Sequence, residues 1–375
     1  MPKRIKTREP GIYSVERADG GKSYEVAYRN AEGKRRQETF RNFNAARDFK
    51  RRSHSEVKAG THVDSSDGKL TLTEYYRSFR ERQVWESGTF KLCDISVKSC
   101  TFADVPLGKV RRSHVEQWVK TMSETLKPST IRTRVSYVTM VVNGAIRDQY
   151  LVRDPMKGVP LPRLSKDEMN IPLPGQVGRL LEHSHPHYRA FWSVCAFAGL
   201  RPGEAAGLKV EDIRWLQREL RVERQVQPLG RGTVDVKEPK FGSQRTVYIP
   251  ERLVKILAQH VEEGTNGDWL FMGSSGNPPT HHSYAPRWAE ALDAAEVGPY
   301  RVHDLRHFFA SGLIAAGTDV VTVQRQLGHQ SATVTLNRYS HLWNTHQEVT
   351  RTAVEAMMKQ AMDSDVGIVT GKQGA

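Results

Sequence analysis

A proline-rich segment near the middle of the sequence limits the fold more than any other feature. Residues 154–174, DPMKGVPLPRLSKDEMNIPLP, contain five prolines. Proline lacks a backbone N–H and has a restricted φ, so this segment can neither continue a helix nor lie in the middle of a sheet. Because 375 residues also exceed the usual size of one domain, we expect separate domains joined by an extended linker at 158–173.

The N-terminal part of the chain is strongly basic. Residues 1–60 contain sixteen Lys and Arg against eight Asp and Glu, in a chain whose formal net charge is +14. The stretches GIYSVER, KSYEVAYR and KRRQETF, separated by DGG and NAEG, predict a small three-stranded sheet that a helix follows. The charge favours a DNA-contacting module, with Lys34, Arg35 and Arg36 as candidate contacts; a basic surface that faces solvent or another protein is the alternative.

The region 70–157 predicts a compact helical domain, which a Ser/Asp/Gly-rich linker at 61–69 precedes. Apolar residues recur at helical spacing in several stretches. These stretches are 71–85, 113–125, 128–149 and a further candidate at 90–100. Lys127, Arg132 and Arg134 fall on polar positions, where either phosphates or water can meet them.

Several classes of protein are disfavoured by composition. No run of about 18 apolar residues occurs, and the basic N-terminus has no apolar stretch behind it, so we expect no membrane partner, no signal peptide and a cytoplasmic location. Cys93, Cys100 and Cys195 lack the spacing of a disulfide framework or a zinc site. The adjacent His281 and His282 indicate a polar loop rather than a metal site. No cofactor and no metal are expected.

Beyond residue 174 the sequence contains five motifs in a fixed order over about 140 residues. They are GLRPGEAAGLKVEDI (199–213), PKFGSQRTVYIP (239–250), HDLRHFFAS (303–311), LGH (327–329) and NRYSHL (337–342). Together they resemble the catalytic domain of the tyrosine recombinase (phage integrase) family. Residues 70–157 look, more loosely, like its core-binding domain, and 1–60 like the arm-site-binding domain of some phage integrases.

The resemblance implies a multidomain, mainly α protein. A small N-terminal three-stranded β-sheet plus helix (1–60) is followed by the helical core-binding domain (70–157) and a mixed α+β, mostly helical catalytic domain (174–345). A C-terminal helix and tail (346–375) come last. The apolar face of that helix is expected either to dock onto a neighbouring protomer or to pack back on its own domain.

The chemistry of this family explains the residue types in the motifs. Attack on a phosphodiester spreads negative charge over the phosphate oxygens, and arginine offers a permanent cation that matches two oxygens at once. A phenol can attack phosphorus and leave again, which makes the step reversible. The resemblance implies six catalytic residues, with Tyr339 as the nucleophile: Arg201, Lys240, His303, Arg306, His329 and Tyr339.

One carboxylate, Glu204, and one histidine, His307, are expected to have supporting roles. Glu204 lies three residues after Arg201 and is expected to fix an arginine or cap a helix. His303 and Arg306 share one helix face, whereas His307 points about 100° away from Arg306 and suits a supporting contact.

The catalytic lysine is expected between two strand-like segments of the sequence. Lys240 is implied as the proton donor to the leaving 5′ oxygen, delivered by a β-hairpin, with Lys237 as the rival. Arg245 and Thr246 are interpreted as residues that line the strand.

We therefore expect an integrase that breaks and rejoins duplex DNA through a 3′-phosphotyrosine, without metal or ATP, to integrate and excise phage or mobile-element DNA. Expected partners are core and arm-type attachment sites, three further protomers in a homotetramer on DNA, a DNA-bending host factor and an excisionase-type factor. Three alternatives stand: a type IB topoisomerase-like enzyme, a non-catalytic DNA-binding regulator, and a metal-dependent transposase.

Overall fold

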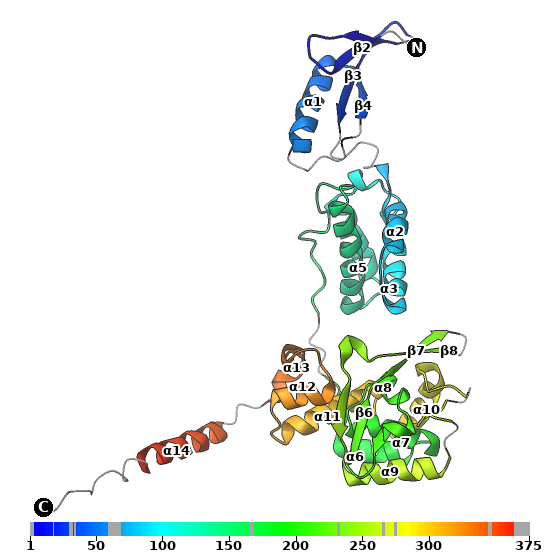
Figure 1. Cartoon of the computed structure of the whole chain (residues 1–375), viewed down its shortest axis with the longest axis vertical. Coiled ribbons are helices and arrows are strands. Elements are labelled where there is room, and N and C mark those ends of the chain that lie inside the picture. Colours follow the sequence, from blue (N-terminus) through cyan, green and yellow to red (C-terminus); the bar gives the residue numbers. More distant parts are fainter. Residues whose placement is uncertain are drawn as a thin grey trace, which may run out of the picture. The chain divides into compact units, whose positions relative to one another are not determined.

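A computed structural model of the chain forms two compact units, Met1–Asp167 and Glu168–Ala375 (Figure 1). The structure describes residues 4–17, 19–29, 33, 35–58, 69–164, 169–230, 233–264, 267–273, 276–343 and 347–363. Apart from Lys69, the predicted linker 61–69 lies outside these residues, as do 165–168 of the second linker. In the described part of the chain, no helix combines the length and apolarity that a bilayer crossing requires.

The first unit begins with an antiparallel sheet in the order β1-β2-β3-β4. Its strands are β1 (Arg4–Lys6), β2 (Ile12–Glu16), β3 (Lys22–Arg29) and β4 (Arg35–Phe40). Helix α1 (Phe43–Lys58) packs on this sheet, and Ile12, Val26 and Ala46 form the buried core between them. The three predicted strands are confirmed as β2, β3 and β4. The sheet has a fourth strand, β1, which was missed because it has only three residues, all exposed, and lacks the alternation that reveals a half-buried strand.

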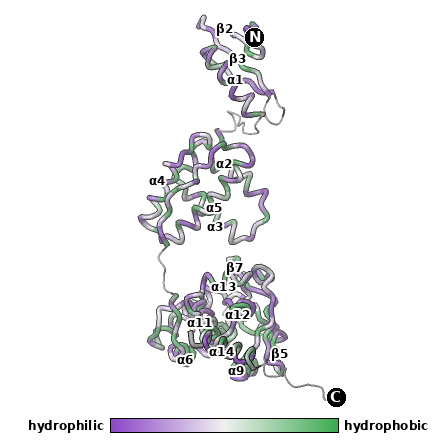
Figure 2. Tube along the Cα trace, turned by 90° about the vertical axis from the view of Figure 1, so that its left-hand side faces the viewer, coloured by the Kyte–Doolittle hydropathy of each residue, from purple (hydrophilic) through white to green (hydrophobic). Residues whose placement is uncertain are grey.

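Four longer helices complete the first unit, and they confirm the predicted helical stretches. They are α2 (Leu72–Glu81), α3 (Ser87–Lys98), α4 (Arg112–Ser123) and α5 (Pro128–Arg147). Apolar and polar residues alternate along these helices (Figure 2), and the apolar ones form a core that includes the fully buried Trp118 and Val138. The division of this unit into domains at 1–60 and 70–157 stays a prediction.

The second unit combines helices with two small sheets. Its helices are α6 (Pro174–Glu182), α7 (Pro186–Phe197), α8 (Pro202–Ala206), α9 (Glu251–Glu262), α10 (His281–Ala294), α11 (Val302–Ala315), α12 (Val320–Leu327), α13 (Ala332–Tyr339) and α14 (Gln347–Asp363). Its strands are β5 (Ile213–Arg214), β6 (Glu219–Val222), β7 (Gln225–Gly230), β8 (Thr233–Lys237) and β9 (Arg245–Tyr248). Strands β5, β6 and β9 form one antiparallel sheet, and β7 pairs with β8 in another.

Two hydrophobic clusters organise the second unit. The larger surrounds α7, whose second half is apolar on all sides, as expected of a buried helix segment; Phe191, Trp192 and Cys195 are completely buried there. The smaller joins α11, α12 and α13, which lie together in Figure 1, and its buried members include Leu327 and Tyr339. This second cluster therefore determines where the last two sequence motifs meet.

The predicted C-terminal helix is present as α14. Ala356, Met357 and Ala361, three of the residues on its predicted apolar face, are exposed, whereas the side chains of Val349 and Ala353 lie outside those described. The described part of this face is thus exposed.

Candidate active site

The site is built around Arg201, at the start of a short helix. Pro202 occupies the first position of α8, where its restricted φ suits a helix and its missing N–H costs nothing. The backbone N–H of Arg201 donates to Oε2 of Glu204 at 2.9 Å, which caps the helix. The motif RPGE thus brings the side chains of Arg201 and Glu204 together at the edge of the core.

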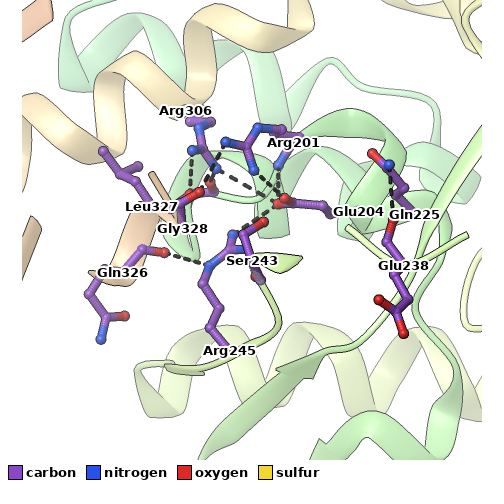
Figure 3. A network of polar contacts seen from close by, with 11 residues as sticks. Arg201, Glu204, Gln225, Glu238, Ser243, Arg245, Arg306, Gln326, Leu327 and Gly328 are labelled. Carbon is purple, nitrogen blue, oxygen red and sulfur yellow. Dashed lines mark hydrogen bonds and ion pairs between the residues drawn. The ribbon is translucent and has the colours of Figure 1, made fainter. Parts of the chain in front are cut away.

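Glu204 is 1% exposed and lies among three arginines, whose guanidinium groups all point toward its carboxylate (Figure 3). Nη1 of Arg201 lies 2.5 Å from Oε1, Nη2 of Arg245 lies 2.9 Å from Oε2, and Nη1 of Arg306 lies 3.7 Å from Oε2. Burial alone would raise the pKa of Glu204, but these cations, Arg245 most strongly, outweigh it and lower the pKa to about 2. Glu204 therefore stays ionised and holds the cluster together.

The carbonyl groups at the C-terminal end of α12 supply further partners of the arginines. Nε of Arg245 donates to the Gln326 carbonyl at 2.8 Å, and Arg306 donates to the Leu327 carbonyl. Nη2 of Arg201 donates to the Gly328 carbonyl at 3.2 Å. The last carbonyls of a helix lack partners within the helix and carry partial negative charge, so they suit cations.

Gly328 ends α12 in the left-handed conformation, with φ of +61°. A Cβ atom at this position would lie 2.8 Å from Nη1 of Arg245. The LGH motif therefore requires glycine both for its backbone conformation and for the close approach of a guanidinium group.

Arg306 is buried on α11, where Nη1 also donates to the carbonyl of Gly199 at 2.7 Å. Burial and the neighbouring Arg201 lower the pKa of Arg306 to about 9. The group nevertheless remains a cation at neutral pH. Two guanidinium groups, those of Arg201 and Arg306, thus meet beside one carboxylate, and their role as a phosphate clamp stays a prediction.

Tyr339 ends α13 and is 1% exposed. Its phenolic oxygen lies 2.7 Å from Nδ1 of His307, and its ring stacks on that of His329, with centroids 6.3 Å apart and planes 12° apart. Burial raises the pKa of Tyr339, whereas Arg306, the neighbouring Arg338 and Arg201 act in the opposite direction. The structure thus places the phenol in contact with two histidines and in the field of the arginine cluster.

Three histidines line the same region. His303 on α11 lies beside His307, with ring centroids 5.0 Å apart, and Nδ1 of His329 lies 2.8 Å from Oγ1 of Thr335. Burial is the main reason that the pKa falls to about 4 for His303 and about 3 for His307 and His329, and nearby positive charges lower all three further. At neutral pH all three rings are therefore uncharged in the free protein.

Lys240 is the one predicted catalytic residue that the structure does not bring to the cluster. It is exposed and begins a single 3-10 turn, η4 (Lys240–Gly242), between β8 and β9. Within the described residues it makes no hydrogen bond or ion pair with Glu204 or the arginines around it. Its rival Lys237 forms an ion pair with Asp235 at 3.0 Å.

The predicted DNA contacts outside this unit lie at two separate places. Arg35 and Arg36 are on β4, and Lys34 lies outside the described residues. Lys127 is exposed directly before α5, whose first turns contain the half-buried Arg132 and Arg134. Nε of Arg132 donates to the carbonyl of Pro162 at 3.0 Å, so this side chain also holds the linker against α5.

Sequence reasoning missed two arginines of the site. Arg245, interpreted as lining a strand, is buried on Glu204. Strand alternation could have revealed it, since Arg245 shares a face with the fully buried Val247. Arg338 lies 3.0 Å from Nε2 of His307. Its only signal was its place next to Tyr339.

Comparisons with known proteins agree with this fold. Residues 173–346 match the Phage integrase family. A tyrosine recombinase of Thermosipho africanus is 25% identical over 254 residues, which cover 64% of this chain and 83% of that protein. The structure of the Tn1549 transposon integrase in complex with a circular intermediate DNA has a TM-score of 0.68 at 18% identity and covers 77% of this chain and 99% of that one. The lambda integrase tetramer bound to a Holliday junction has a TM-score of 0.58 at 16% identity, with coverage of 88% and 98%.

The fold and the site therefore define an enzyme that breaks and rejoins DNA. Residues 173–346 match the phage integrase family, the chain is similar to tyrosine recombinases, and its fold is that of the integrases.

Proposed function

We propose that this protein is a site-specific integrase that joins itself to a DNA 3′ phosphate through Tyr339. One observation carries the proposal: the phenol of Tyr339 lies against His307 and His329, and the residue before His329 binds Arg201 through its carbonyl. Nucleophile, histidines and phosphate-binding cations thus converge in one unit.

In the proposed cleavage step, Arg201 and Arg306 bind the non-bridging oxygens of the scissile phosphate and stabilise the charge that develops there. The oxygen of Tyr339 attacks phosphorus and its proton passes to water, while the bond from phosphorus to the 5′ oxygen breaks. The leaving 5′ oxygen takes up a proton, for which Lys240 is the proposed donor, with His303 and His329 as further hydrogen-bonding groups.

Rejoining reverses this reaction with a different 5′ hydroxyl as the nucleophile. One phosphodiester is exchanged for one phosphotyrosine and then for another phosphodiester, so the sequence of steps needs no ATP. Nor does this route call for a metal ion.

Residues 1–60 are proposed to bind arm-type sites, through Arg35 and Arg36 among others, and residues 70–157 to bind core sites. One nucleophilic tyrosine per chain and four strand cuts imply four protomers on DNA. The lambda integrase, which was solved as a tetramer on a Holliday junction, supports this stoichiometry. The protein is further proposed to integrate and excise phage or mobile-element DNA. A DNA-bending factor and an excisionase-type factor are its proposed helpers.

A nicked attachment-site duplex tests the proposal, because the short strand that carries the 5′ hydroxyl diffuses away after cleavage. The full-length protein should form a denaturant-resistant adduct with this substrate in EDTA, and Tyr339→Phe should form none. An adduct that forms equally well on unrelated duplexes would instead favour a topoisomerase-like enzyme. Specific binding without any adduct would favour a regulator.

A further inference from the structure

We propose that Arg338 fixes the tautomer of His307, so that His307 donates a hydrogen bond from Nδ1 to the phenolic oxygen of Tyr339. This inference rests on the proposed role of Tyr339 as the nucleophile. It adds His307 as a catalytic residue, since it touches the reacting oxygen, and Arg338 as a positioning residue that acts through it.

Both ring nitrogens of His307 have a close partner. Nε2 lies 3.0 Å from Nη2 of Arg338, and Nδ1 lies 2.7 Å from the oxygen of Tyr339. The imidazole is 2% exposed and the phenol 1%, so neither group can exchange its partner for bulk water without movement. Arg338 and Tyr339 are consecutive on α13, whereas His307 comes from α11.

The nature of these partners determines where the proton lies. A guanidinium group has five N–H donors and no acceptor, so Nε2 of His307 must accept the hydrogen bond from Arg338. A neutral imidazole carries one proton, which then resides on Nδ1. Nδ1 therefore donates, and the oxygen of Tyr339 accepts.

A doubly protonated His307 would not fit this arrangement, because its Nε2–H would face an N–H of Arg338. The charged and titratable groups that surround the ring are mostly positive or neutral. They are His303, Asp304 and Arg306 on α11 and Arg338 and Tyr339 on α13.

The tautomer has a direct chemical consequence. A hydrogen bond donated to the phenolic oxygen stabilises the phenoxide more than the phenol, so it favours both the attack by Tyr339 and its departure during rejoining. Because Nδ1 already holds a proton and Nε2 is engaged, His307 is not the base that deprotonates Tyr339. The phenol proton passes to water instead.

Nitrogen NMR of the full-length, DNA-free protein tests the tautomer directly. With ¹⁵N-labelled histidine at neutral pH, and the His307 signals assigned by their loss in His307→Gln, we expect a protonated Nδ1 and an unprotonated Nε2. Arg338→Lys, which retains a donor, should preserve this pattern, and Arg338→Met should shift it toward the other tautomer. A proton on Nε2 in the natural protein, or a pattern that Arg338→Met leaves unchanged, would overturn the proposal.

Two substitutions of His307 test the consequence for cleavage. The amide nitrogen of asparagine can occupy the place of Nδ1, whereas that of glutamine reaches the place of Nε2. With the nicked substrate, His307→Asn should retain adduct formation within about tenfold, and His307→Gln should lose about a hundredfold, as expected for one lost donor to a developing oxyanion. Equal rates for the two variants would contradict the proposal. If the natural protein forms no adduct, the proposed function fails, whereas the NMR result still decides the tautomer.

Discussion

Oε2 of Glu204 lies 2.9 Å from Nη2 of Arg245, and both side chains are almost fully buried. The same carboxylate also contacts Arg201 and Arg306. A single buried anion therefore holds three cations next to the proposed phosphate site. When DNA is absent, this carboxylate offsets part of the repulsion among the guanidinium groups.

Glu204→Gln should consequently destabilise the protein strongly. Removal of one partner from a buried charge network costs about 3–5 kcal/mol in free energy of unfolding, because the remaining charges lose their compensation. The control is Glu290→Gln, which removes a carboxylate that is 60% exposed and paired with Arg287; a change within about 0.5 kcal/mol is expected there. Urea denaturation of the full-length protein measures the free energy of unfolding of both variants. Equal losses in the two variants would show that Glu204 does not hold the cluster together.

Gly328→Ala should disturb Arg245 as well as the backbone. Its Cβ would lie 2.8 Å from a guanidinium nitrogen, in addition to the strain of a positive φ. Gly317 also has a positive φ, +82°, but nothing lies within 4 Å of its Cβ position. Gly317→Ala should therefore show only backbone strain, about 1 kcal/mol. Gly328→Ala should lose more stability and also most of the adduct-forming activity, and a result no worse than that of Gly317→Ala would argue against the contact.

If Arg201 and Arg306 clamp the scissile phosphate, their loss should lower the rate of adduct formation much more than the affinity for duplex DNA. Arg201→Ala should lower the rate of adduct formation by at least about a hundredfold, because a cation at the transition state is lost. Duplex affinity should fall by less than about tenfold, since many other contacts to DNA remain. Arg287→Ala, at an exposed ion pair in the same unit, serves as the matched control and should change neither quantity. Equal losses of rate and affinity for Arg201→Ala would mean that Arg201 docks DNA without acting on the phosphate.

The histidine cluster predicts a loss of stability in acid. The folded-state pKa is about 4 for His303 and about 3 for His307 and His329, each below the ordinary value of 6.5. Between these values the unfolded chain binds protons that the folded chain does not. The contribution of the neutral rings is thus complete above pH 6.5 and is lost as pH falls toward 4.

Hydrogen exchange of α11–α13 between pH 7 and 4.5, corrected for the intrinsic rate, measures this dependence. His307→Asn should reduce the slope of the opening free energy against pH by up to about 1.4 kcal/mol per pH unit, because one titrating group is removed. An unchanged slope in His307→Asn would show that this ring does not resist protonation in the folded state.

The order of the motifs predicted which residues meet, because each motif combines a structural signal with a chemical group. Gly328 ends a helix and its carbonyl reaches Arg201, while Pro202 begins the helix that Glu204 caps. Arg245 was missed because its role depends on the burial of Glu204, which is 41 residues away in the chain.

Other features lacked a local signal altogether. Strand β1 is short and exposed, and it exists through pairing with β2 rather than through its own pattern. The position of Lys240 was equally beyond local reasoning, because a lysine in a turn between strands has no packing partner that dictates its direction. DNA itself is the partner that we expect to order it.

The identity of the covalently linked residue tests the central claim most directly. After reaction with the nicked attachment site in EDTA, the protein–DNA adduct is digested with nuclease and protease, and the modified peptide is sequenced by mass spectrometry. We predict a peptide that contains residues 337–342, with the DNA 3′ phosphate esterified to Tyr339. Attachment to any other residue, or an adduct that persists in Tyr339→Phe, would contradict the account.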